Sequence, residues 1–588
     1  MIDYGRFEQG CGLNWYDVDP DLHFLMDFHL AAEDREWADI HLSRMGAVCG
    51  GPIAERAEIV DKNPPRLERY DRWGEEVNHV VHHPAALATK RDLWEMGFLG
   101  LRWSEEAKGR GRAVPPVLLR ALQYLVCQAD TGMVCSLGMT TAAAALINRY
   151  APPDVRERFF ARMTTTRYDD AIDGSMFLTE KLGGSDLGGA VTTTARLSPD
   201  GWVLSGEKWF CSNVDGGVIM ALARPEGAPA GVRGLALFLV PKWRRNGRHN
   251  AIHIRRIKDK LGTRSVPTAE VELRDAEAYL LAGSSTVPDG RGLNRMMEMV
   301  NDSRIGVATM GLGIMRRCFL ESAIYVAHRE AFGKLLWNQP MVREQLTHML
   351  VDLEAAAAMV FAAATDGGNE ARALSRILVP LAKFRVTRRG IQCASLAVEL
   401  HGGNGYIENW PLARQLRDAQ CHTIWEGAEN VICLDVLRSM TKERAHDALL
   451  ARVDTALEQS RHEGLAVPVE AVRAGLADVR EILTAVAMME RDAVQLHARA
   501  ITGYLADLTQ AALLLEQASW ELTHRGSARK ALVARIFTDR YLTAHPSRGI
   551  LSGDRVALDL FDELVRYGNI TPERASTYLR GPTARKTT

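Results

Sequence analysis

The sequence has no C-x-x-C pair, and its nine cysteines are scattered and odd in number. Zinc sites and dithiol redox motifs place two cysteines close together, and a disulfide framework uses an even number. A zinc site, a dithiol redox motif and a disulfide framework are therefore not expected, and no metal ligands are predicted. Isolated thiols suit buried positions in a reducing compartment, so we expect a cytoplasmic protein.

An excess of one charge is also missing, since 72 Lys+Arg balance 73 Asp+Glu. Such a chain has no overall attraction to nucleic acid or to an anionic membrane. Its clearest apolar run, residues 355–364, falls short of the roughly eighteen residues that a membrane span needs. Residues 1–12 contain acids and no basic segment, unlike a signal peptide. We therefore expect neither a membrane span nor a signal peptide.

At 588 residues the chain is too long for one hydrophobic core, so several domains are expected. Residues 1–170 carry apolar side chains at the three- and four-residue spacing of helices. Residues 171–290 change to short runs of Val, Thr, Leu and Phe divided by Gly and Pro, which predicts a small antiparallel barrel or sandwich with a hairpin turn at 198–201. Helical patterns return over 291–440, typical of a bundle, and continue over 441–588. The expected fold is mainly α with a central β domain.

Two polar segments interrupt the β region. The segment "TEKLGGSDLGG" (179–189) lies between strand-like runs, so it is neither the glycine loop of a dinucleotide fold nor a phosphate-binding loop, and alone it could be a turn cluster. Together with "GEKWFCSN" (206–213) it would present hydroxyl groups and one aromatic face to a planar heteroaromatic ligand. The residues concerned are Thr179, Ser185, Phe210 and Ser212.

Two more segments lie in the bundle region. "HREAFGKLL" places a cation, Arg329, at the end of a helix, where a solvated surface arginine is the ordinary alternative. "ELHGGNGYIENWP" ends a helix in Gly402 and Gly403. Glycine at a helix end lets the backbone turn tightly and lets a ligand approach closely.

One carboxylate, Glu426, stands in "TIWEGAEN" within an otherwise apolar segment. Desolvation penalises the charged form of such a group, so we expect it to have either an oppositely charged partner or a functional role. It is either a structural group paired with an arginine such as Arg414 or Arg417, or a base held for chemistry.

In this order and spacing the segments resemble the acyl-CoA dehydrogenase family of flavoproteins, from about residue 50 to 440. The motifs are "FLTEKLGGSD", "GEKWFCSN", "KLGTRSVPTAEVEL", "REAFGKLL", "ELHGGNGYIENWPLARQLRDA" and "TIWEGAEN". The segment "NPPRLERYD" and the extra C-terminal helices resemble more closely the AidB-like branch, associated with the bacterial adaptive response to alkylation. The resemblance implies an N-terminal helical domain (1–170), a β domain (171–290), a four-helix bundle (291–440) and an additional helical domain (441–588).

The resemblance also implies FAD as the cofactor and an acyl-CoA thioester as the substrate. Glu426 matches the base that removes the α-proton, while the β-hydrogen leaves as hydride to flavin N5 and an enoyl thioester forms. Arg329 resembles an arginine that reaches the FAD of a neighbouring subunit, which implies a homo-oligomer, usually a tetramer, and electron-transfer flavoprotein is the implied acceptor. Cofactor contacts are implied for Met176, Thr179, Ser185, Phe210, Cys211, Ser212, Arg329, Gly402, Gly403, Thr423, Trp425, Gly427 and Asn430, and substrate contacts for Thr179, Ser185, Ser212 and Glu426.

A carboxylate in water is a weak base, and an acyl α-C–H is a weak acid. We expect Trp425, Ile424 and the acyl chain to remove water around Glu426 and so to raise its basicity. General-base catalysis of this kind contributes roughly 10²–10⁴-fold, and backbone N–H groups on the thioester oxygen would add a comparable share. Some family members place the base just before the arginine matching Arg304, but Ser303 stands there in this chain.

Two other functions stay open. The AidB-like resemblance implies a flavoprotein that binds DNA through its last domain, and such binding needs several cations on one face. Residues 441–588 hold 20 Lys+Arg and 19 Asp+Glu, so the domain as a whole is not basic. The stretch 525–548 is richer in arginine, and we interpret it as a solvated helix face or a subunit contact. The other function is an acyl-CoA-binding regulator with little turnover.

Overall fold

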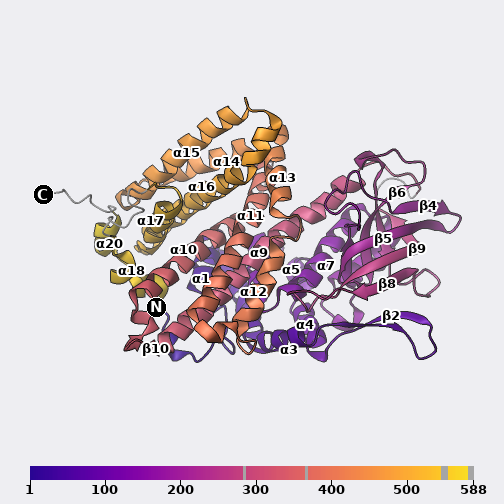
Figure 1. Cartoon of the computed structure of the whole chain (residues 1–588), viewed down its shortest axis with the longest axis horizontal. Helices are drawn as coiled ribbons and strands as arrows, with labels where there is room; N and C mark the ends of the chain where they lie inside the picture. Colours follow the sequence, from indigo (N-terminus) through magenta and orange to yellow (C-terminus); the bar gives the residue numbers. More distant parts are fainter. Residues whose placement is uncertain (282–285, 365–368, 545–553, 580–588) are drawn as a thin grey trace. The chain divides into compact units, whose positions relative to one another are not determined.

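A computed structural model of the chain describes residues 1–281, 286–364, 369–544 and 554–579. The chain divides into two compact units, seen in Figure 1. The bundle unit contains Met1–Gly51, Pro115–Gln128 and Val307–Thr588, and the sheet unit contains Pro52–Val114 and Ala129–Gly306. Because each unit combines segments of more than one expected domain, the boundaries at 170, 290 and 440 stay predictions.

The sheet unit is built on one seven-stranded sheet in the order β3-β5-β4-β6-β7-β9-β8. Long β5 pairs with β3, β4 and β9, so the sheet curls on itself. Most neighbours are antiparallel, as predicted, but β6 pairs in parallel with β3 and β4. The strands are β3 (Gly174–Phe177), β4 (Thr194–Ser198), β5 (Gly201–Ser212), β6 (Val218–Pro225), β7 (Ala236–Pro241), β8 (Ile252–Ile257) and β9 (Thr268–Leu280).

Alternation along the strands gives this sheet two apolar faces. On β7, Leu237 and Leu239 pack in one core with helices α7 (Thr131–Tyr150) and α8 (Pro153–Thr164). The residues between them, such as Phe238, pack in a second core between the strands. The predicted hairpin turn is confirmed: Ser198 pairs with Gly201 between β4 and β5, and Gly201 takes a φ of +118°. The remaining elements of this unit are α3 (Ala54–Lys62), β1 (Arg66–Tyr70), β2 (Glu76–Val81), α4 (Pro84–Glu95) and α5 (Glu105–Gly109).

Helix α7 qualifies the expectation about membrane spans. Among the described residues it is the one helix long and apolar enough to cross a membrane, with a mean hydropathy of 1.3 over its most apolar window. Yet 72% of that window is buried inside the protein, where α7 packs on the sheet. A helix that is apolar on most sides is equally typical of a core position, so it is weak evidence for a membrane.

Helices with wide apolar faces make up the bundle unit. In α10 the buried residues include Leu346, Leu350 and Leu353, at the three- and four-residue spacing expected of a bundle helix. Six of the nine cysteines of the chain are buried. The helices are α1 (Pro20–His29), α2 (Ala32–Val48), α6 (Pro116–Ala129), the later part of α9 (Gly292–His328), α10 (Pro340–Ala362), α11 (Asn369–Leu400), α12 (Pro411–His422) and α13 (Glu429–Glu443).

The additional C-terminal helices belong to the same compact unit. Helix α16 packs against α10, α11 and α13, and α17 packs beside it, as Figure 1 shows. Arg389 of α11 meets Asp507 of α16 at 2.8 Å. The C-terminal helices are α14 (Ala445–Gln459), α15 (Ala466–Val486), α16 (Arg491–Arg525), α17 (Arg529–Tyr541), α18 (Val556–Asp559), α19 (Phe561–Val565) and α20 (Pro572–Leu579).

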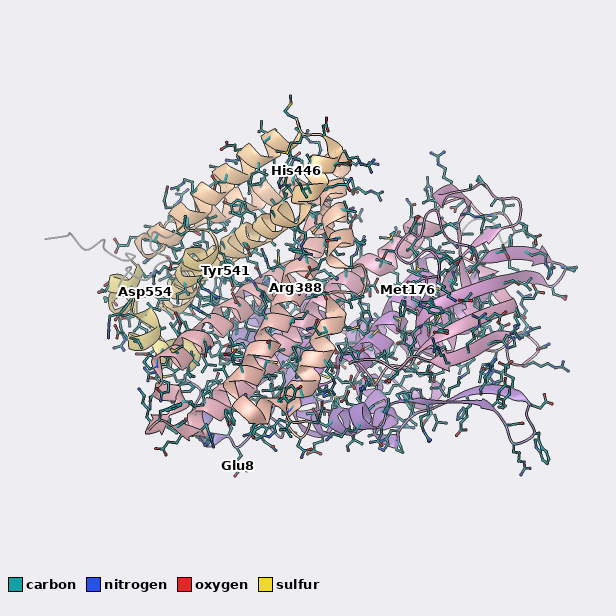
Figure 2. The ribbon with its side chains drawn as sticks, viewed as in Figure 1. Glu8, Met176, Arg388, His446, Tyr541 and Asp554 are labelled. Carbon is teal, nitrogen blue, oxygen red and sulfur yellow. The ribbon has the colours of Figure 1, made fainter. Side chains whose placement is uncertain are left out.

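Among its described residues the arginine-rich stretch 525–548 is not a solvated helix face, which corrects one of our two interpretations, while a subunit contact stays a prediction. Arg529, Lys530 and Arg535 are at most 5% exposed, because α17 turns them toward the core of the unit. Lys530 lies 2.6 Å from Asp21 and 2.8 Å from Glu354. The other ion pairs of the stretch are Arg525 with Asp27, Arg529 with Glu354, Arg535 with Asp554 (labelled in Figure 2) and Arg540 with Asp352, while Arg548 lies outside the described residues.

Candidate active site

The predicted site residues fall into one group in each unit. The sheet unit holds Met176, Thr179, Ser185, Phe210, Cys211 and Ser212, all at the ends of β3 and β5 or in the loop after β3. The bundle unit holds Arg329, Gly402, Gly403, Thr423, Trp425, Glu426, Gly427 and Asn430, all between helices or at helix ends.

The strands β3 and β5 bring the first group together. Met176 is the register partner of Ser212, whose hydroxyl lies 2.9 Å from that of Thr268. Phe210 is 55% exposed and stands free of the core. An irregularity in the register between Lys208 and Cys211 shifts the alternation of β5, so Cys211 points inward and is fully buried. The predicted cofactor contact of Cys211 is therefore restricted to its backbone.

A buried ion pair that the sequence reasoning missed fixes the spacing of these segments. Glu180, next to Thr179, lies 2.7 Å from the ammonium of Lys208 on β5, and both side chains are almost inaccessible to solvent. The backbone N–H of Trp209 donates to the Thr179 carbonyl at 2.9 Å. Burial alone would raise the pKa of Glu180, but the Lys208 charge and four hydrogen bonds from Thr192 and Thr193 lower it to about 2.

The same carboxylate closes the glycine-rich loop. Thr192 and Thr193, at the end of that loop, bind Glu180 at its beginning, so the loop leaves and re-enters the sheet at one point. Inside the loop Asp186 accepts a hydrogen bond from the N–H of Gly189 at 3.0 Å. Ser185 is exposed at the outer part of the loop. The loop is thus anchored at its base and open at its tip, where both the turn-cluster and the ligand interpretations stay compatible with it.

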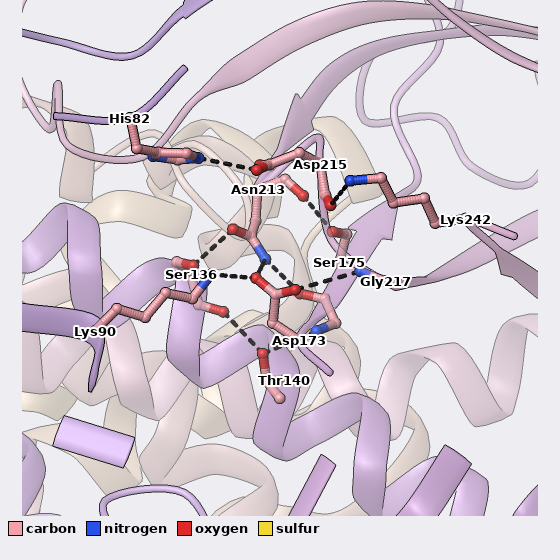
Figure 3. Close-up of polar contacts among 11 residues, drawn as sticks. His82, Lys90, Ser136, Thr140, Asp173, Ser175, Asn213, Asp215, Gly217 and Lys242 are labelled. Carbon is pink, nitrogen blue, oxygen red and sulfur yellow. Dashed lines mark hydrogen bonds and ion pairs between the residues drawn. The ribbon is translucent and has the colours of Figure 1, made fainter. Parts of the chain in front are cut away.

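A buried polar network, shown in Figure 3, holds the ends of β3 and β5 together. The amide oxygen of Asn213 accepts from the Ser136 hydroxyl at 2.7 Å, and its amide nitrogen donates to Asp173 and to the Gly174 carbonyl, both at 3.0 Å. The Asn213 carbonyl in turn accepts from the hydroxyl of Ser175. Asn213 takes a φ of +51°, a conformation that asparagine tolerates better than most residues. The network therefore sets the position of Ser212, one residue earlier.

Two carboxylates of this network are paired with basic side chains from other elements. Lys90 of α4 binds Asp173, and His82 lies 2.9 Å from Asp215. Burial alone would raise the pKa of Asp215, but the hydrogen bond and charge of His82 and the nearby ammonium groups lower it to about 2. The first pair connects the start of β3 to α4, and the second connects the segment after β5 to the segment after β2.

In the bundle unit Glu426 occupies a turn between α12 and α13 rather than a helix or strand. Its φ is +56°, in the left-handed region, and Gly427 follows with a φ of +114°. For a residue with a side chain this conformation costs about 1–2 kcal/mol. Strained residues persist where the surroundings hold them, and they cluster at functional sites.

The surroundings of Glu426 differ from the dry pocket that the sequence suggests. Glu426 and Trp425 are half-buried, and Ile424 is 65% exposed. Without a bound ligand, the side chain of Ile424 therefore does not shield Glu426 from water. Of the two arginines considered as partners, Arg414 lies 3.3 Å from Asp418 and Arg417 binds Glu408, and the structural reading of Glu426 stays open beside the catalytic one.

A buried cation, Lys383, contacts this turn, and the sequence reasoning also missed it. Lys383 of α11 is fully buried and donates hydrogen bonds to the carbonyls of Thr423 (3.0 Å) and Gly427 (2.5 Å). His422 is equally buried, and among the described residues neither of its ring nitrogens has a hydrogen-bond partner. Burial and then the Lys383 charge lower the pKa of His422 to about 3, so the imidazole is neutral.

The first turn of α13 is tied to two other helices. The buried carboxylate of Glu429 lies 2.7 Å from Arg388 of α11 and 2.7 Å from Arg499 of α16. Burial alone would raise the pKa of Glu429, but the two guanidinium groups lower it. Arg499 also donates to the side-chain oxygen of Asn430, so this predicted cofactor residue meets a C-terminal helix.

The other predicted residues of the bundle unit lie at exposed helix ends. Gly402 ends α11 with a φ of +59°, and a Cβ at Gly402 or Gly403 would meet no atom within 4 Å. This open surface allows a ligand to approach the backbone. Arg329 is exposed after α9, at the start of the short hairpin formed by β10 (Glu330–Ala331) and β11 (Lys334–Leu335). The cofactor contact of Arg329 therefore stays a prediction.

Known protein families match the chain in succession. Residues 8–170 match the adaptive response protein AidB N-terminal domain, and residues 175–276 match the acyl-CoA dehydrogenase middle domain. Residues 290–441 match the acyl-CoA dehydrogenase C-terminal domain. Residues 444–560 match the acyl-CoA dehydrogenase 11 C-terminal domain-like family, which accounts for the helices beyond the bundle.

Individual proteins extend this similarity over most of the chain. AidB of Escherichia coli (strain K12) is 33% identical over 427 residues, covering 70% of this chain and 76% of AidB. The 3-methylmercaptopropionyl-CoA dehydrogenase of Ruegeria pomeroyi is 30% identical over 87% of this chain and 92% of its own length. The crystal structure of Caenorhabditis elegans ACDH-11 in complex with C11-CoA superimposes with a TM-score of 0.83 and 28% identity, covering 93% of this chain and 95% of that one. With its domains matched in order and its length covered, the chain belongs to the acyl-CoA dehydrogenase family, in the AidB-like branch.

Proposed function

We propose that this protein is an FAD-dependent acyl-CoA dehydrogenase in which Glu426 removes the α-proton of an acyl-CoA thioester. The observation that supports this most is the conformation of Glu426. A carboxylate is held in a strained left-handed turn that two helices and a buried lysine define.

FAD is the cofactor of this family, and the sheet unit fits such a group. Phe210 offers an exposed aromatic face, the half-buried Met176 and Ser212 are paired on β3 and β5, and the half-buried Thr179 lies in the loop after β3. A planar ring can lie against such a strand edge, with hydroxyl and backbone groups as hydrogen-bond partners. When bound, FAD accepts the β-hydrogen of the substrate as hydride.

The chain's own part of the reaction is proton removal. The Glu426 carboxylate takes the α-proton and becomes a carboxylic acid, while the electrons of the broken C–H bond form the new C=C bond. Because Glu426 is half-buried and Ile424 exposed, we infer that the acyl chain and the cofactor complete the exclusion of water. A general base of this kind contributes about 10²–10⁴-fold to the rate.

An acyl-CoA-binding regulator with little turnover is the second candidate. It is favoured by the same similarity that supports the substrate class, because the C. elegans protein was crystallised with C11-CoA. The DNA-binding alternative has less support, because the described cations from Arg525 to Arg540 pair with acids of the chain. The acceptor, a tetramer and a cytoplasmic location stay predictions.

The test is anaerobic mixing of the purified, FAD-loaded protein with a panel of acyl-CoAs of increasing length and branching. A dehydrogenase bleaches the flavin absorbance with at least one thioester, and the Glu426→Gln variant binds FAD and that thioester without bleaching. Bound acyl-CoA without bleaching in the unmodified protein would favour the regulator. Unchanged bleaching by Glu426→Gln would refute the role of Glu426.

A further inference from the structure

Lys383 is a buried cation whose contacts converge on the turn that carries Glu426. Its side chain is 0% exposed, and its ammonium donates to the Thr423 carbonyl at 3.0 Å and to the Gly427 carbonyl at 2.5 Å. These two carbonyls lie on either side of residues 424–426. One side chain from α11 therefore spans the turn from beginning to end.

An ammonium group suits this position. It carries three N–H donors and no acceptor, so it can bind two carbonyl oxygens at once. Hydrogen bonds from a charged donor are shorter and stronger than neutral ones, and the low dielectric of a buried site strengthens them further. Removing the donors would leave one buried and one partly buried carbonyl without this partner.

The turn needs such an anchor because its backbone is strained. Glu426 has a φ of +56° and Gly427 a φ of +114°. A residue with a side chain returns to the ordinary right-handed or extended regions unless contacts on both sides prevent it. The ends of the turn are joined to helices α12 and α13, and Lys383 fixes the separation between them.

We propose that Lys383 is the positioning residue of the catalytic turn: by binding the carbonyls of Thr423 and Gly427 it holds Glu426 in its left-handed conformation and aims the carboxylate. This role rests on the proposed function of Glu426 as the base. Lys383 acts through the backbone of the turn, and no contact with substrate is required of it.

The variant that tests this is Lys383→Met, which keeps the length of the side chain and removes its donors. We expect FAD content and acyl-CoA dissociation constant close to those of the unmodified protein, and a flavin reduction rate constant lower by about 100-fold, the effect of displacing a catalytic group by about 1 Å. Lys383→Gln, which keeps N–H donors on a shorter side chain, should lose less, and it replaces the methionine variant if that one does not fold.

The control is Lys530→Met, which removes another buried lysine of the bundle unit, bound to Asp21 and Glu354. It lowers thermal stability without touching the turn, so its flavin reduction rate should stay within twofold of the unmodified value. An equal loss of reduction rate in both variants would show that Lys383 matters only for the fold, and would overturn the proposal.

A double-mutant comparison separates positioning from a general effect. If Lys383 acts through Glu426, then adding Lys383→Met to Glu426→Gln lowers the residual reduction rate by less than twofold. A full 100-fold further loss would contradict the proposal, because Lys383 would then be acting on another group.

Hydrogen exchange of the amides at 424–428 keeps this test independent of turnover. Lys383→Met should speed their exchange at least tenfold, and Lys530→Met should not. Suppose that none of the acyl-CoAs bleaches the flavin of the unmodified protein, but amide exchange responds to Lys383→Met as expected. The proposed function then fails, and the anchoring of the turn by Lys383 stands. If exchange is unchanged in Lys383→Met, the anchoring is refuted whatever the activity.

Discussion

Glu180 and Lys208 form an ion pair inside the sheet unit, with the ammonium 2.7 Å from the carboxylate and both side chains at most 4% exposed. The pair joins the residue next to Thr179 to the strand that carries Phe210 and Ser212. Lys208 also donates to the Leu222 carbonyl at 3.0 Å, which links β5 to β6. This buried pair is therefore one of the interactions that set the spacing of the predicted flavin-binding segments.

Replacing Lys208 by methionine should destabilise the sheet unit and lower its FAD content. The change leaves the carboxylate of Glu180 buried without its cation, and breaking a buried pair costs about 3–5 kcal/mol. The threonines that bind Glu180 keep the loss at the lower end of that range. The measurements are denaturant unfolding and the ratio of flavin to protein after purification.

The matched control is the double variant Lys208→Met with Glu180→Gln. Without a charge on Glu180 there is no unpaired carboxylate to bury, so the double variant should recover part of the stability. If the single and double variants are equally unstable, the ion pair is not the cause of the loss.

The low pKa of Glu180 predicts a specific acid sensitivity. The carboxyl has a pKa of about 2 in the folded chain against an ordinary 4.5, so its contribution is complete above pH 4.5 and is lost as the pH falls toward 2. The shift corresponds to a contribution on the order of 3 kcal/mol. The stability advantage of the unmodified protein over Glu180→Gln should therefore shrink steadily from pH 5 to pH 2.5. An advantage independent of pH would show that the charge is not responsible.

The fold and the motif segments could be predicted because they rest on local patterns. The alternation on β5 even contained the missed signal, since Lys208 has the same parity as Trp202 and Leu204, which face the core. A lysine on the inward face of a strand predicts a buried partner. Because Lys208 stands in the polar motif "GEKWFCSN", we interpreted this segment only as part of a ligand-binding site.

Lys383 and the basic stretch of α17 could not be found this way, because their partners are distant in the sequence. Lys383 lies 40 residues before Thr423 and binds its backbone carbonyl, and a backbone partner cannot be recognised from the residue types in the sequence. Lys530 pairs with Asp21, 509 residues earlier. Helical periodicity separates apolar from polar faces, but it does not show which polar residues another domain will cover.

The pairing of Glu429 with Arg388 and Arg499 predicts how these two arginines contribute to the stability of the protein beside the turn that carries Glu426. Arg388 and Arg499 are 41% and 58% exposed, so losing either one should change the free energy of unfolding by less than about 1 kcal/mol. Losing both leaves a buried carboxylate three residues after Glu426 without a cation, which costs more than the two single losses together. Unfolding of Arg388→Ala, Arg499→Ala and the double variant measures this, and strictly additive losses would contradict it.

The buried cations of α17 give the last prediction, which separates a structural role from DNA binding. Lys530→Ala should destabilise the bundle unit by about 3–5 kcal/mol, because Asp21 and Glu354 lose their shared cation in a dry site. Arg473→Ala and Arg480→Ala, which change exposed arginines of α15, should be nearly neutral. Thermal unfolding and salt-dependent retention on DNA are measured for all three. If α17 were a DNA-binding face, Lys530→Ala would keep its melting temperature and lose retention, whereas the buried ion pairs require the melting temperature to fall and leave retention to other residues.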